Sequence, residues 1–213
     1  GPIQVNTYLA YDEETKEGFI VDPGAYCPEL TSKAEEAGVD IKYIILTHGH
    51  GDHIGGIEGH LKDFPGAKIK IANDGNCSAL VESKFGANRG KRDSAFVTIS
   101  TGIGLGIVHN GKRIDTTLEA GRLLTNYKGK LYEVEGLLSG KGIGTLCKLN
   151  GIEDIPSGKE FFEAVRQSRE DIRPVYEEWK NRIAVFFADL QLLFDNEAYA
   201  LSGGVRKSKD LFV

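Results

Sequence analysis

The feature that most constrains the fold is an alternation of short apolar, β-branched runs with longer helix-forming segments. Residues 41–46 (Ile-Lys-Tyr-Ile-Ile-Leu) have the composition of a buried strand, and the flanking segments 28–37 and 56–64 are rich in helix formers. Further along, 95–99 and 106–109 are again short apolar runs of the strand type. Strands that alternate with helices in this way predict an α/β protein.

The remaining elements are expected to extend this pattern. A charged hairpin turn, Asp12–Lys16, is expected between strands at 4–10 and 18–21. The longest helix is expected at 174–194, because Pro174 is tolerated in a first turn and a broad apolar stripe follows it. The stripe consists of Val175, Trp179, Ile183, Val185, Phe186, Leu190 and Leu193. Other expected elements are strands at 67–72 and 198–201, helices at 77–85 and 159–169, and a loop-rich region at 115–154 with short helical pieces.

Charge and cysteine usage restrict the partners and the compartment. The formal net charge is −5, which argues against nucleic acid or an anionic membrane as the main partner, since both repel an acidic chain. Apolar runs all fall short of the roughly 20 residues that span a bilayer. Cys27, Cys77 and Cys147 are far apart and form no CxxC pair, which favours a reducing compartment. We therefore expect a cytoplasmic protein with small-molecule partners, and we leave a homo-oligomer open.

A cluster of His48, His50, Asp52 and His53 directly follows the strand at 41–46. Imidazole nitrogens and carboxylate oxygens are ligands for zinc, iron or manganese. A loop at the end of a strand lets closely spaced side chains converge, and the intervening glycines allow a tight backbone. The spacing predicts a metal site. The alternative is a set of histidines on a surface loop.

The first segment resembles the metallo-β-lactamase hydrolase superfamily, and its glyoxalase II-like branch in particular. The matching stretches are Asn6-Thr7-Tyr8, Val21-Asp22-Pro23-Gly24 and Ile44 to Gly56, which contains the histidine cluster. The resemblance implies that His48 and His50 bind one metal and that Asp52 and His53 bind a second. A metal-bound hydroxide would then attack an ester, thioester, amide or phosphodiester.

This resemblance covers only about residues 1–70, and the family uses further ligands beyond that point. His60 and His109 are the other histidines of the chain. His60 lies on the helix after the motif, where no ligand role is evident, and His109 lies beside a hairpin signal, Asn110-Gly111. A complete dinuclear centre is therefore not expected from this chain, and a weak mononuclear site is the most that the resemblance implies.

A second candidate is the glycine-rich stretch 98–106, which includes Thr101, Gly102 and Gly104. Closely spaced glycines leave backbone N–H groups able to face an anion, and hydroxyls add donors. The stretch lacks the Gly-Lys-Ser/Thr of a P-loop, and a strand rather than a helix follows it, which excludes the dinucleotide fingerprint. From these residues alone, an ordinary glycine-rich turn is an equally good interpretation.

The neighbours of this stretch resemble the ROK family of repressors and sugar kinases, over about residues 73–205. The matching elements are 73–80, 85–87, 98–106 and 110–112, followed by Glu119-Ala120-Gly121-Arg122 and Leu201-Ser202-Gly203-Gly204-Val205. Arg122 stands where the sugar-binding element of that family usually has histidine. The resemblance implies an actin-like, RNase H-like lobe and phosphoryl transfer from ATP to a sugar hydroxyl with Mg²⁺.

The resemblance also implies roles for individual residues. Asp74 would be the general base that deprotonates the sugar hydroxyl. From the residues alone, Asn73-Asp74-Gly75 is equally a turn. The other implied contacts are Asn73, Glu119 and Arg122 for the sugar, and Thr101, Gly102, Gly104, Gly203 and Gly204 for the nucleotide.

Together the two resemblances predict a chimera of two incomplete α/β lobes, a metallo-β-lactamase-like segment at 1–71 and a ROK-like lobe at 72–213. The ROK phosphate element Asp-x-Gly-Gly-Thr and the family's cysteine-rich zinc element are missing from the sequence. Sugar kinase activity is therefore expected to be impaired, because positioning of both substrates supplies much of the catalysis. The alternatives are a metal-dependent hydrolase, a fusion without catalysis, and a single α/β fold that uses both motifs.

Overall fold

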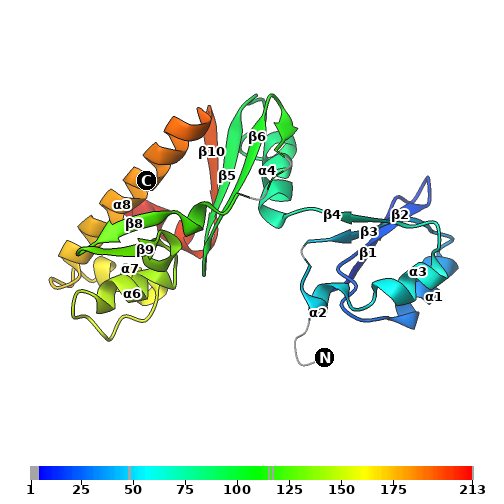
Figure 1. Ribbon diagram of the computed structural model, residues 1–213, viewed down its shortest axis with the longest axis horizontal. Coiled ribbons are helices and arrows are strands. Elements are labelled where there is room, and N and C mark those ends of the chain that lie inside the picture. Colours follow the sequence, from blue (N-terminus) through cyan, green and yellow to red (C-terminus); the bar gives the residue numbers. More distant parts are fainter. Residues whose placement is uncertain (1–4, 48, 115, 117, 213) are drawn as a thin grey trace. The chain divides into compact units, whose positions relative to one another are not determined.

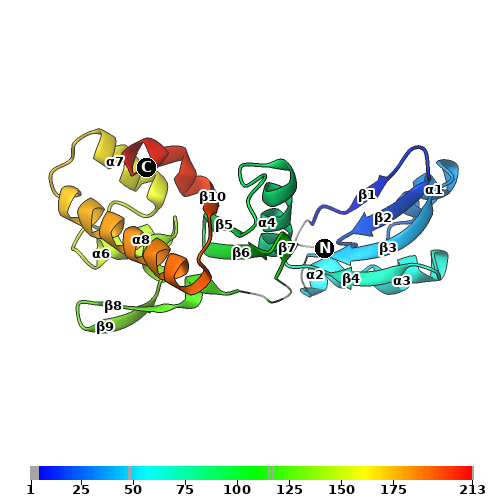
Figure 2. The ribbon, with the colours of Figure 1, turned by 90° about the horizontal axis from the view of Figure 1, so that it is seen from above.

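A computed structural model describes residues 5–47, 49–114, 116 and 118–212 (Figures 1 and 2). The chain divides into two compact units, Gly1–Asp74 and Gly75–Val213. Each unit contains a four-stranded sheet with helices, so the predicted α/β class is confirmed. Within the described ranges, no helix combines the length and the apolar character needed to cross a membrane.

The first unit is a sheet of order β1-β2-β3-β4 with three helices. β1 and β2 form the expected antiparallel hairpin, and β3 and β4 continue the sheet in parallel. The strands are β1 (Tyr8–Tyr11), β2 (Glu17–Val21), β3 (Asp40–Leu46) and β4 (Lys68–Ile71), and the helices are α1 (Pro28–Glu36), α2 (Gly51–Ile54) and α3 (Ile57–Asp63).

One face of this sheet forms the core of the first unit. Ile20 and Ile44 are paired across β2 and β3 and are fully buried, and Ile20 packs with Leu30 and Ala34 of α1. The opposite face is open, because the neighbouring pair Phe19 and Tyr43 is exposed. All four residues of the edge strand β4 are exposed as well.

His60 belongs to this core and is completely buried on α3. Its Nε2 accepts a hydrogen bond of 3.4 Å from the backbone N–H of Cys27, and its ring packs against Tyr26 with the centroids 5.2 Å apart. Burial lowers the pKa of His60, because the charged imidazolium is poorly solvated there. His60 thus packs inside the first unit, where burial favours its neutral form.

The second unit is built on a sheet of order β10-β5-β6-β7. Its strands are β5 (Ser94–Ile99), β6 (Ile103–His109), β7 (Lys112–Arg113) and β10 (Ala198–Ser202). One face carries Phe96, Val108 and Ala200, which pack with Ala79 of α4 (Asp74–Phe85). The other face carries Ala95, Val97 and Ile99 and faces the main core. The alternation along β5 therefore places one helix on one face and the rest of the unit on the other.

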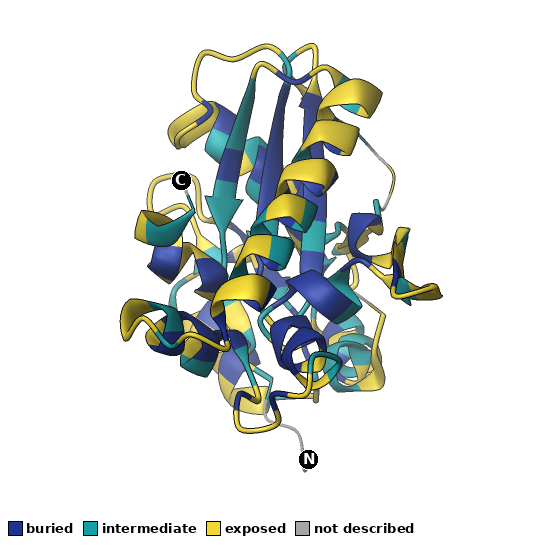
Figure 3. Cartoon of the chain, turned by 90° about the vertical axis from the view of Figure 1, so that its left-hand side faces the viewer, coloured by how far each residue is buried: buried dark blue, intermediate teal, exposed yellow. Residues whose placement is uncertain are grey.

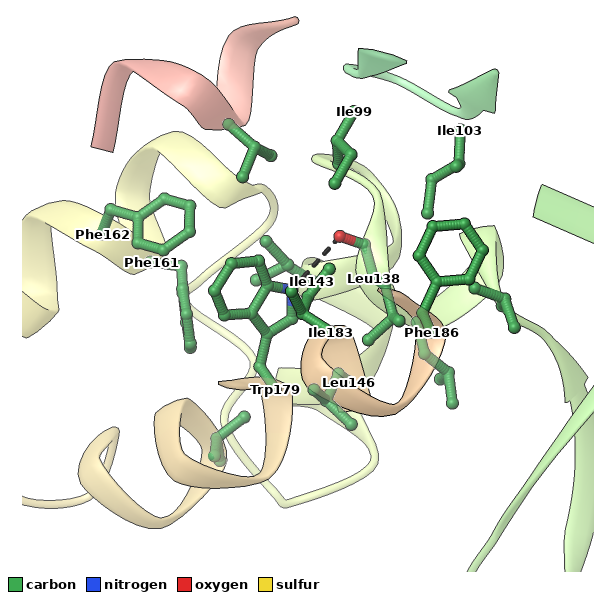
Figure 4. Packing of buried hydrophobic residues seen from close by; sticks show 14 of the residues in the cluster. Ile99, Ile103, Leu138, Ile143, Leu146, Phe161, Phe162, Trp179, Ile183 and Phe186 are labelled. Carbon is green, nitrogen blue, oxygen red and sulfur yellow. Dashed lines mark hydrogen bonds between the residues drawn. The ribbon is translucent and has the colours of Figure 1, made fainter. Parts of the chain in front are cut away.

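The main core gathers around Trp179 (Figure 4). Phe161 and Phe162 contact the Trp179 ring with centroids 6.4 and 5.2 Å away, and Trp179 Nε1 donates a 3.2 Å hydrogen bond to the Leu138 carbonyl. The helices that build this core are α5 (Glu135–Leu138), α6 (Gly142–Lys148), α7 (Gly158–Arg166) and α8 (Arg173–Phe194), followed by the 3₁₀ helix η2 (Gly204–Leu211).

Four sequence expectations differ from the structure. The turn expected at Asn73-Asp74-Gly75 is wrong, because Asp74 is the first residue of α4. β6 begins at Ile103 rather than at residue 106, since glycines at alternate positions weaken the apolar signal of a strand. Val185 and Leu193 are exposed rather than part of the buried stripe. The loop-rich region contains the 3₁₀ helix η1 (Ala120–Arg122) and a hairpin of β8 (Leu124–Tyr127) and β9 (Lys130–Glu133).

The buried neutral His60 predicts that the first unit loses stability on acidification. The folded-state pKa is lower than the ordinary value of about 6.5, so the stabilising contribution is present above that value and is lost as the pH falls through the folded pKa. NMR titration of the His60 ring should show a pKa below the ordinary value, and hydrogen exchange should show the first unit opening more often as the pH falls below that ordinary value.

The matched variants are His60→Gln and His109→Gln. The first removes the titrating group and should flatten the pH dependence of hydrogen exchange in the first unit, whereas the second alters an exposed residue of the other unit and should leave it unchanged. An ordinary pKa for His60, or the same pH dependence after its replacement, would contradict the prediction.

Candidate active site

The parallel pairing of β5 with β10 brings the two glycine-rich segments together. Thr98 lies opposite Ser202, so both strands end at the same edge of the sheet. Gly203 follows with φ of 92°, and a Cβ there would lie 2.2 Å from the Ile99 carbonyl oxygen. Glycine is therefore required at 203, both for its left-handed backbone and for its approach to β5.

The predicted phosphate loop is the tip of the β5–β6 hairpin. Ser100, Thr101 and Gly102 connect the strands, and the Ser100 N–H donates to the Gly102 carbonyl at 2.9 Å. Gly104 lies within β6 opposite Thr98 rather than in the loop. The connection is thus shorter than expected, and Thr101 and Gly102 are the predicted nucleotide residues at its tip.

A cleft of about 690 Å³ opens beside this hairpin tip. Its size is within the usual range for a small-molecule site. It combines apolar side chains with hydroxyls and cations, all from the second unit. The lining residues are Ser100, Thr101, Gly140, Lys141, Pro156, Ser157, Gly158, Lys159, Phe162, Arg166, Gly204, Val205, Lys207 and Ser208. Two predicted nucleotide contacts, Thr101 and Gly204, therefore line one cleft although they are about a hundred residues apart in the chain.

The charged residues that line the cleft are all cationic. Lys141, Lys159, Arg166 and Lys207 line it, and its lining includes no Asp or Glu. Arg166 is held by Asp210 at 3.0 Å, whereas the three lysines form no ion pair among the described residues. The cleft can accordingly take an anionic group at its cationic wall and an apolar ring against Phe162 and Val205.

The cationic residues of the cleft were not among the candidates from the sequence. A signal for two of them is present, because Ser-Gly-Lys occurs at 139–141 and again at 157–159. In both cases the glycine is close to another backbone: Gly140 N–H donates to the Ser100 carbonyl at 2.6 Å, and Gly158 N–H donates to the Gly140 carbonyl at 2.6 Å. The repeated tripeptide thus stacks two segments beside the hairpin tip.

The expected sugar-binding element, residues 119–122, does not line the cleft. Glu119 precedes η1 and Arg122 is its last residue; both are exposed, and Arg122 Nε lies 3.8 Å from Glu119 Oε2. Gly121 packs so closely that a Cβ would lie 2.7 Å from the Ile103 carbonyl oxygen. The structure therefore places this element against the start of β6.

Glu135 connects these parts, although the sequence did not single it out. Its Oε2 accepts the Ile103 N–H at 3.0 Å. Hypothetical Cβ atoms on Gly102 and Gly121 would each lie 2.8 Å from the same oxygen. One carboxylate thus lies between the hairpin tip and the 119–122 element, and both glycines make room for it.

Asn73 and Asp74 stand at the boundary between the two units, where Asp74 opens α4. The start of that helix is fixed within the second unit. A Cβ on Gly106 would lie 2.1 Å from the Gly75 carbonyl oxygen, so helix and strand approach backbone to backbone. Asn76 Nδ2 also donates to the Thr116 carbonyl at 2.8 Å. The roles of Asn73 and Asp74 stay predictions.

In the first unit, the histidine motif is organised by the buried Asp22. Its carboxylate accepts the Thr47 N–H at 2.8 Å and the Thr47 hydroxyl at 2.7 Å, and His53 Nδ1 lies 3.0 Å from Asp22 Oδ2. Burial acts to raise the pKa of Asp22, but the hydrogen bonds from Thr47 and the contact with His53 outweigh it, so this pKa is lowered.

Two of the predicted metal ligands, Asp52 and His53, lie close to each other. His53 Nε2 lies 3.8 Å from Asp52 Oδ2, while His50 is the exposed residue before α2. His48 lies outside the described residues. No three His, Cys, Asp or Glu side chains of residues 5–47, 49–114, 116 and 118–212 form a cluster suited to a metal ion. The described donors alone therefore do not complete a metal site.

The close approach at Gly203 predicts a site-specific loss of stability. Gly203→Ala should lower the urea midpoint of the second unit, because the new Cβ must displace the Ile99 carbonyl and the backbone keeps a positive φ, each costing about 1–3 kcal/mol. Fluorescence of Trp179, the single tryptophan, reports this unit. Gly204→Ala is the matched control, since a Cβ there has open space; equal midpoints for both variants would contradict the prediction.

Two comparisons with curated proteins match different activities. The bifunctional enzyme NanE/NanK of Brucella suis is 32% identical over 144 residues, which cover 66% of this chain and 27% of that protein. Hydroxyacylglutathione hydrolase GloC of Haemophilus influenzae is 38% identical over 71 residues, which cover 33% of this chain and 32% of that protein. The chain thus spans about a third or less of the length of these relatives.

Solved structures share the fold. A ROK hexokinase from Thermus thermophilus superposes with a TM-score of 0.68 at 21% identity, covering 99% of this chain and 84% of that one. A ROK family glucokinase from Streptomyces griseus, in complex with glucose and AMPPNP, gives a TM-score of 0.57 at 21% identity, covering 97% and 82%. The observed architecture is therefore that of ROK sugar kinases.

The family model described as "ROK family" matches residues 40–212. This match begins earlier than residue 73, where the motifs first resemble the family, and it includes all of the cleft. It extends over most of the chain. The chain belongs to the ROK family.

Proposed function

We propose that the chain is a ROK-type, sugar-kinase-like protein that binds ATP in the cleft of its second unit and transfers a phosphoryl group to a sugar hydroxyl. The observation that carries this proposal is the convergence of Thr101 and Gly204 on one cleft that also has a cationic wall. An apolar pocket beside clustered cations suits a nucleotide, which has a flat base and a polyanionic tail.

One region of the cleft suits the base of a nucleotide, and another suits its phosphates. Phe162 and Val205 offer apolar surface for the base. Lys141 and Lys159 offer cations for phosphate oxygens, and Thr101 adds a hydroxyl at the hairpin tip. Mg²⁺, arriving with the nucleotide, would neutralise phosphate charge during transfer. The lining contains no carboxylate to hold this ion, so we assign no protein ligand to it.

On the sugar side, the proposal keeps the predicted roles. Asp74 would accept the proton of the sugar hydroxyl as its oxygen attacks the γ-phosphorus, while the bond from the γ-phosphorus to the bridging oxygen breaks and ADP leaves. Asn73, Glu119 and Arg122 would contact the sugar, with Arg122 donating where the family usually has histidine. Glu135 is added to this set, because its carboxylate lies between Gly121 and the hairpin tip.

We further propose that the chain binds nucleotide but transfers the phosphoryl group to a sugar poorly. The cleft is formed by the second unit alone. Transfer also needs the sugar held in line with the phosphate, and the sequence lacks the Asp-x-Gly-Gly-Thr phosphate element. N-acetylmannosamine and glucose are the first sugars to test, because the names of structurally similar proteins, one from Listeria monocytogenes and the Streptomyces griseus glucokinase, contain them.

Calorimetry with ATP and Mg²⁺ tests the binding step. We expect measurable binding by the full chain, and a Kd about tenfold weaker or more in Lys159→Ala, because a charge-assisted contact contributes about 1.5–3 kcal/mol. Lys148→Ala is the matched control, since Lys148 is an exposed lysine of α6 outside the cleft. Absence of binding, or equal effects of the two substitutions, would overturn the nucleotide assignment.

Release of ADP in the presence of sugar tests the transfer step. Asp74→Asn should abolish sugar-dependent ADP release while leaving the calorimetric Kd for ATP within about twofold, because a general base acts on the other substrate. If the wild-type chain binds ATP and releases no ADP with either sugar, it is a binding protein rather than a kinase.

A second candidate is a metal-dependent hydrolase function of the first unit. The contact of His53 Nδ1 with Asp22 favours it, because a carboxylate partner on one ring nitrogen orients the other toward a metal, here on the side of Asp52. Bound zinc, iron or manganese would lower the pKa of a bound water. We propose at most a mononuclear site from His48, His50, Asp52 and His53.

Metal analysis of the purified chain tests this candidate. We expect up to about one equivalent of zinc, iron or manganese, and its loss in His53→Gln but not in His109→Gln, whose histidine belongs to the second unit. Metal below about a tenth of an equivalent after incubation with each ion would remove the hydrolase from consideration, and so would retention of the metal in His53→Gln.

A further inference from the structure

The strand β4 presents free main-chain groups at one edge of the first unit's sheet. Within the described ranges it pairs with β3 on one side and with no strand on the other (Figure 2). Directly after the strand, the Ala72 N–H donates to the Leu46 carbonyl of β3 at 3.0 Å. Main-chain groups point alternately to the two sides of a strand, so those of Ile69 and Ile71 point away from β3. These two residues can therefore bond to an added strand.

On the core face of the sheet, β4 ends an aliphatic row that is uncovered at the edge. Ile69 lies opposite Ile44, which lies opposite Ile20. The two inner isoleucines are fully buried, whereas Ile69 is 45% exposed. Ile71 is 65% exposed, although it lies opposite the buried Leu46. An aliphatic side chain on an added strand would continue this row and cover the two exposed isoleucines.

On the open face, β4 carries two positive charges without a partner. Lys68 lies opposite Tyr43, and Lys70 lies opposite Ile45. Both lysines are exposed, and neither forms an ion pair in the part of the chain that the structure describes. By contrast, Lys42 on the neighbouring strand β3 is paired with Asp40. Carboxylates are therefore the groups that an added strand would need on this face.

The second unit protects the edge of its sheet in a different way. β10 is an edge strand of that sheet, and all of its residues are buried or half-buried. Figure 3 shows the strands of the second unit as largely buried or half-buried. All residues of β4, in contrast, are exposed. Full exposure is thus a particular feature of β4 and not a general consequence of lying at an edge.

From these features we propose that β4 is a docking edge for an extended segment of another protein in which acidic and aliphatic residues alternate. The segment adds a further strand to the sheet through main-chain hydrogen bonds to Ile69 and Ile71. Its aliphatic side chains cover these two isoleucines, and its carboxylates lie opposite Lys68 and Lys70. The alternation reads the same in both directions, so it suits a parallel and an antiparallel strand.

The two faces of β4 together determine the chemistry of the partner. A segment with basic residues, another copy of β4 included, would set like charges against Lys68 and Lys70. A segment that is acidic throughout would place charges beside Ile69 and Ile71 on the core face, where they are poorly solvated. Only the alternating pattern satisfies both faces. The proposal does not depend on the proposed function, because β4 belongs to the first unit and the cleft to the second.

Fluorescence anisotropy with the full chain and a labelled heptapeptide of alternating glutamate and valine tests the docking. We expect saturable binding with a Kd below about 1 mM. The control ligand has the same composition with its glutamates grouped before its valines, and it should bind about tenfold more weakly or worse, because no register satisfies both faces. Binding of the alternating peptide should also slow hydrogen exchange of the Ile69 and Ile71 amides, which locates the contact.

Charge reversal supplies an independent readout. The double variant Lys68→Glu and Lys70→Glu should bind the glutamate peptide about tenfold more weakly or worse, and should instead bind a peptide of alternating lysine and valine. The matched control is Lys33→Glu with Lys62→Glu, which changes the net charge equally at exposed lysines of α1 and α3. This control should keep the wild-type affinity within about twofold, because exposed charges away from the edge are screened.

Ile69→Pro tests the main-chain hydrogen bonds. It removes an N–H that points away from β3, so the first unit should keep its far-UV spectrum while the peptide no longer binds. Four results would overturn the proposal: no binding of the alternating peptide, equal affinity for the grouped peptide, unchanged affinity after reversal of Lys68 and Lys70, or slowed exchange elsewhere than at Ile69 and Ile71. Equal affinity for the two peptides would assign the contact to charge alone.

Discussion

The pairing of β5 with β10 is the constraint on which the second unit depends. These strands lie about a hundred residues apart in the chain, and their parallel register places the ends of both at one edge of the sheet. The hairpin tip and the Gly203–Gly204 segment can meet only there. The core around Trp179 lies on one face of the same pair. Packing and site are thus consequences of one long-range contact, whose loop-closure entropy the core offsets.

Local elements with strong signals were predictable from the sequence. The long helix was predicted at 174–194 and is found at Arg173–Phe194, because Pro174 marks its start and the buried stripe has helical period. The Asn110-Gly111 turn was predicted for the same kind of reason: both residues have the positive φ that a tight hairpin needs. Lys128-Gly129 has the same geometry without the asparagine, and the short, exposed β8 and β9 offered no apolar alternation, so that hairpin was missed.

Residues that line the cleft were predictable where glycine and hydroxyl residues form a motif in the sequence. They were not predictable where tertiary packing alone determines which residues come together. Thr101 and Gly204 line the cleft, whereas Gly104 and Gly106 are strand residues, and Gly106 serves the approach of α4. A glycine count cannot separate a residue that faces an anion from one that admits a helix. Lys207 and Glu135 were missed because their importance arises from tertiary contacts. In the first unit, Asp22 was recognised only as part of a stretch that resembles the hydrolase superfamily, since its contacts with Thr47 and His53 join distant segments.

The edge strand β4 has a further consequence for the behaviour of the chain in concentrated solution. Its sequence, Lys68-Ile69-Lys70-Ile71, is exposed throughout, and one side of the strand has no neighbour in the sheet. Exposed isoleucines on such an edge strand favour pairing with strands of other molecules. The alternating lysines oppose this, because stacking two copies of the edge would bring like charges together. The same two lysines that contribute nothing to the core therefore act as gatekeepers against aggregation, and neutralising them would make the chain prone to form fibrous, β-rich assemblies.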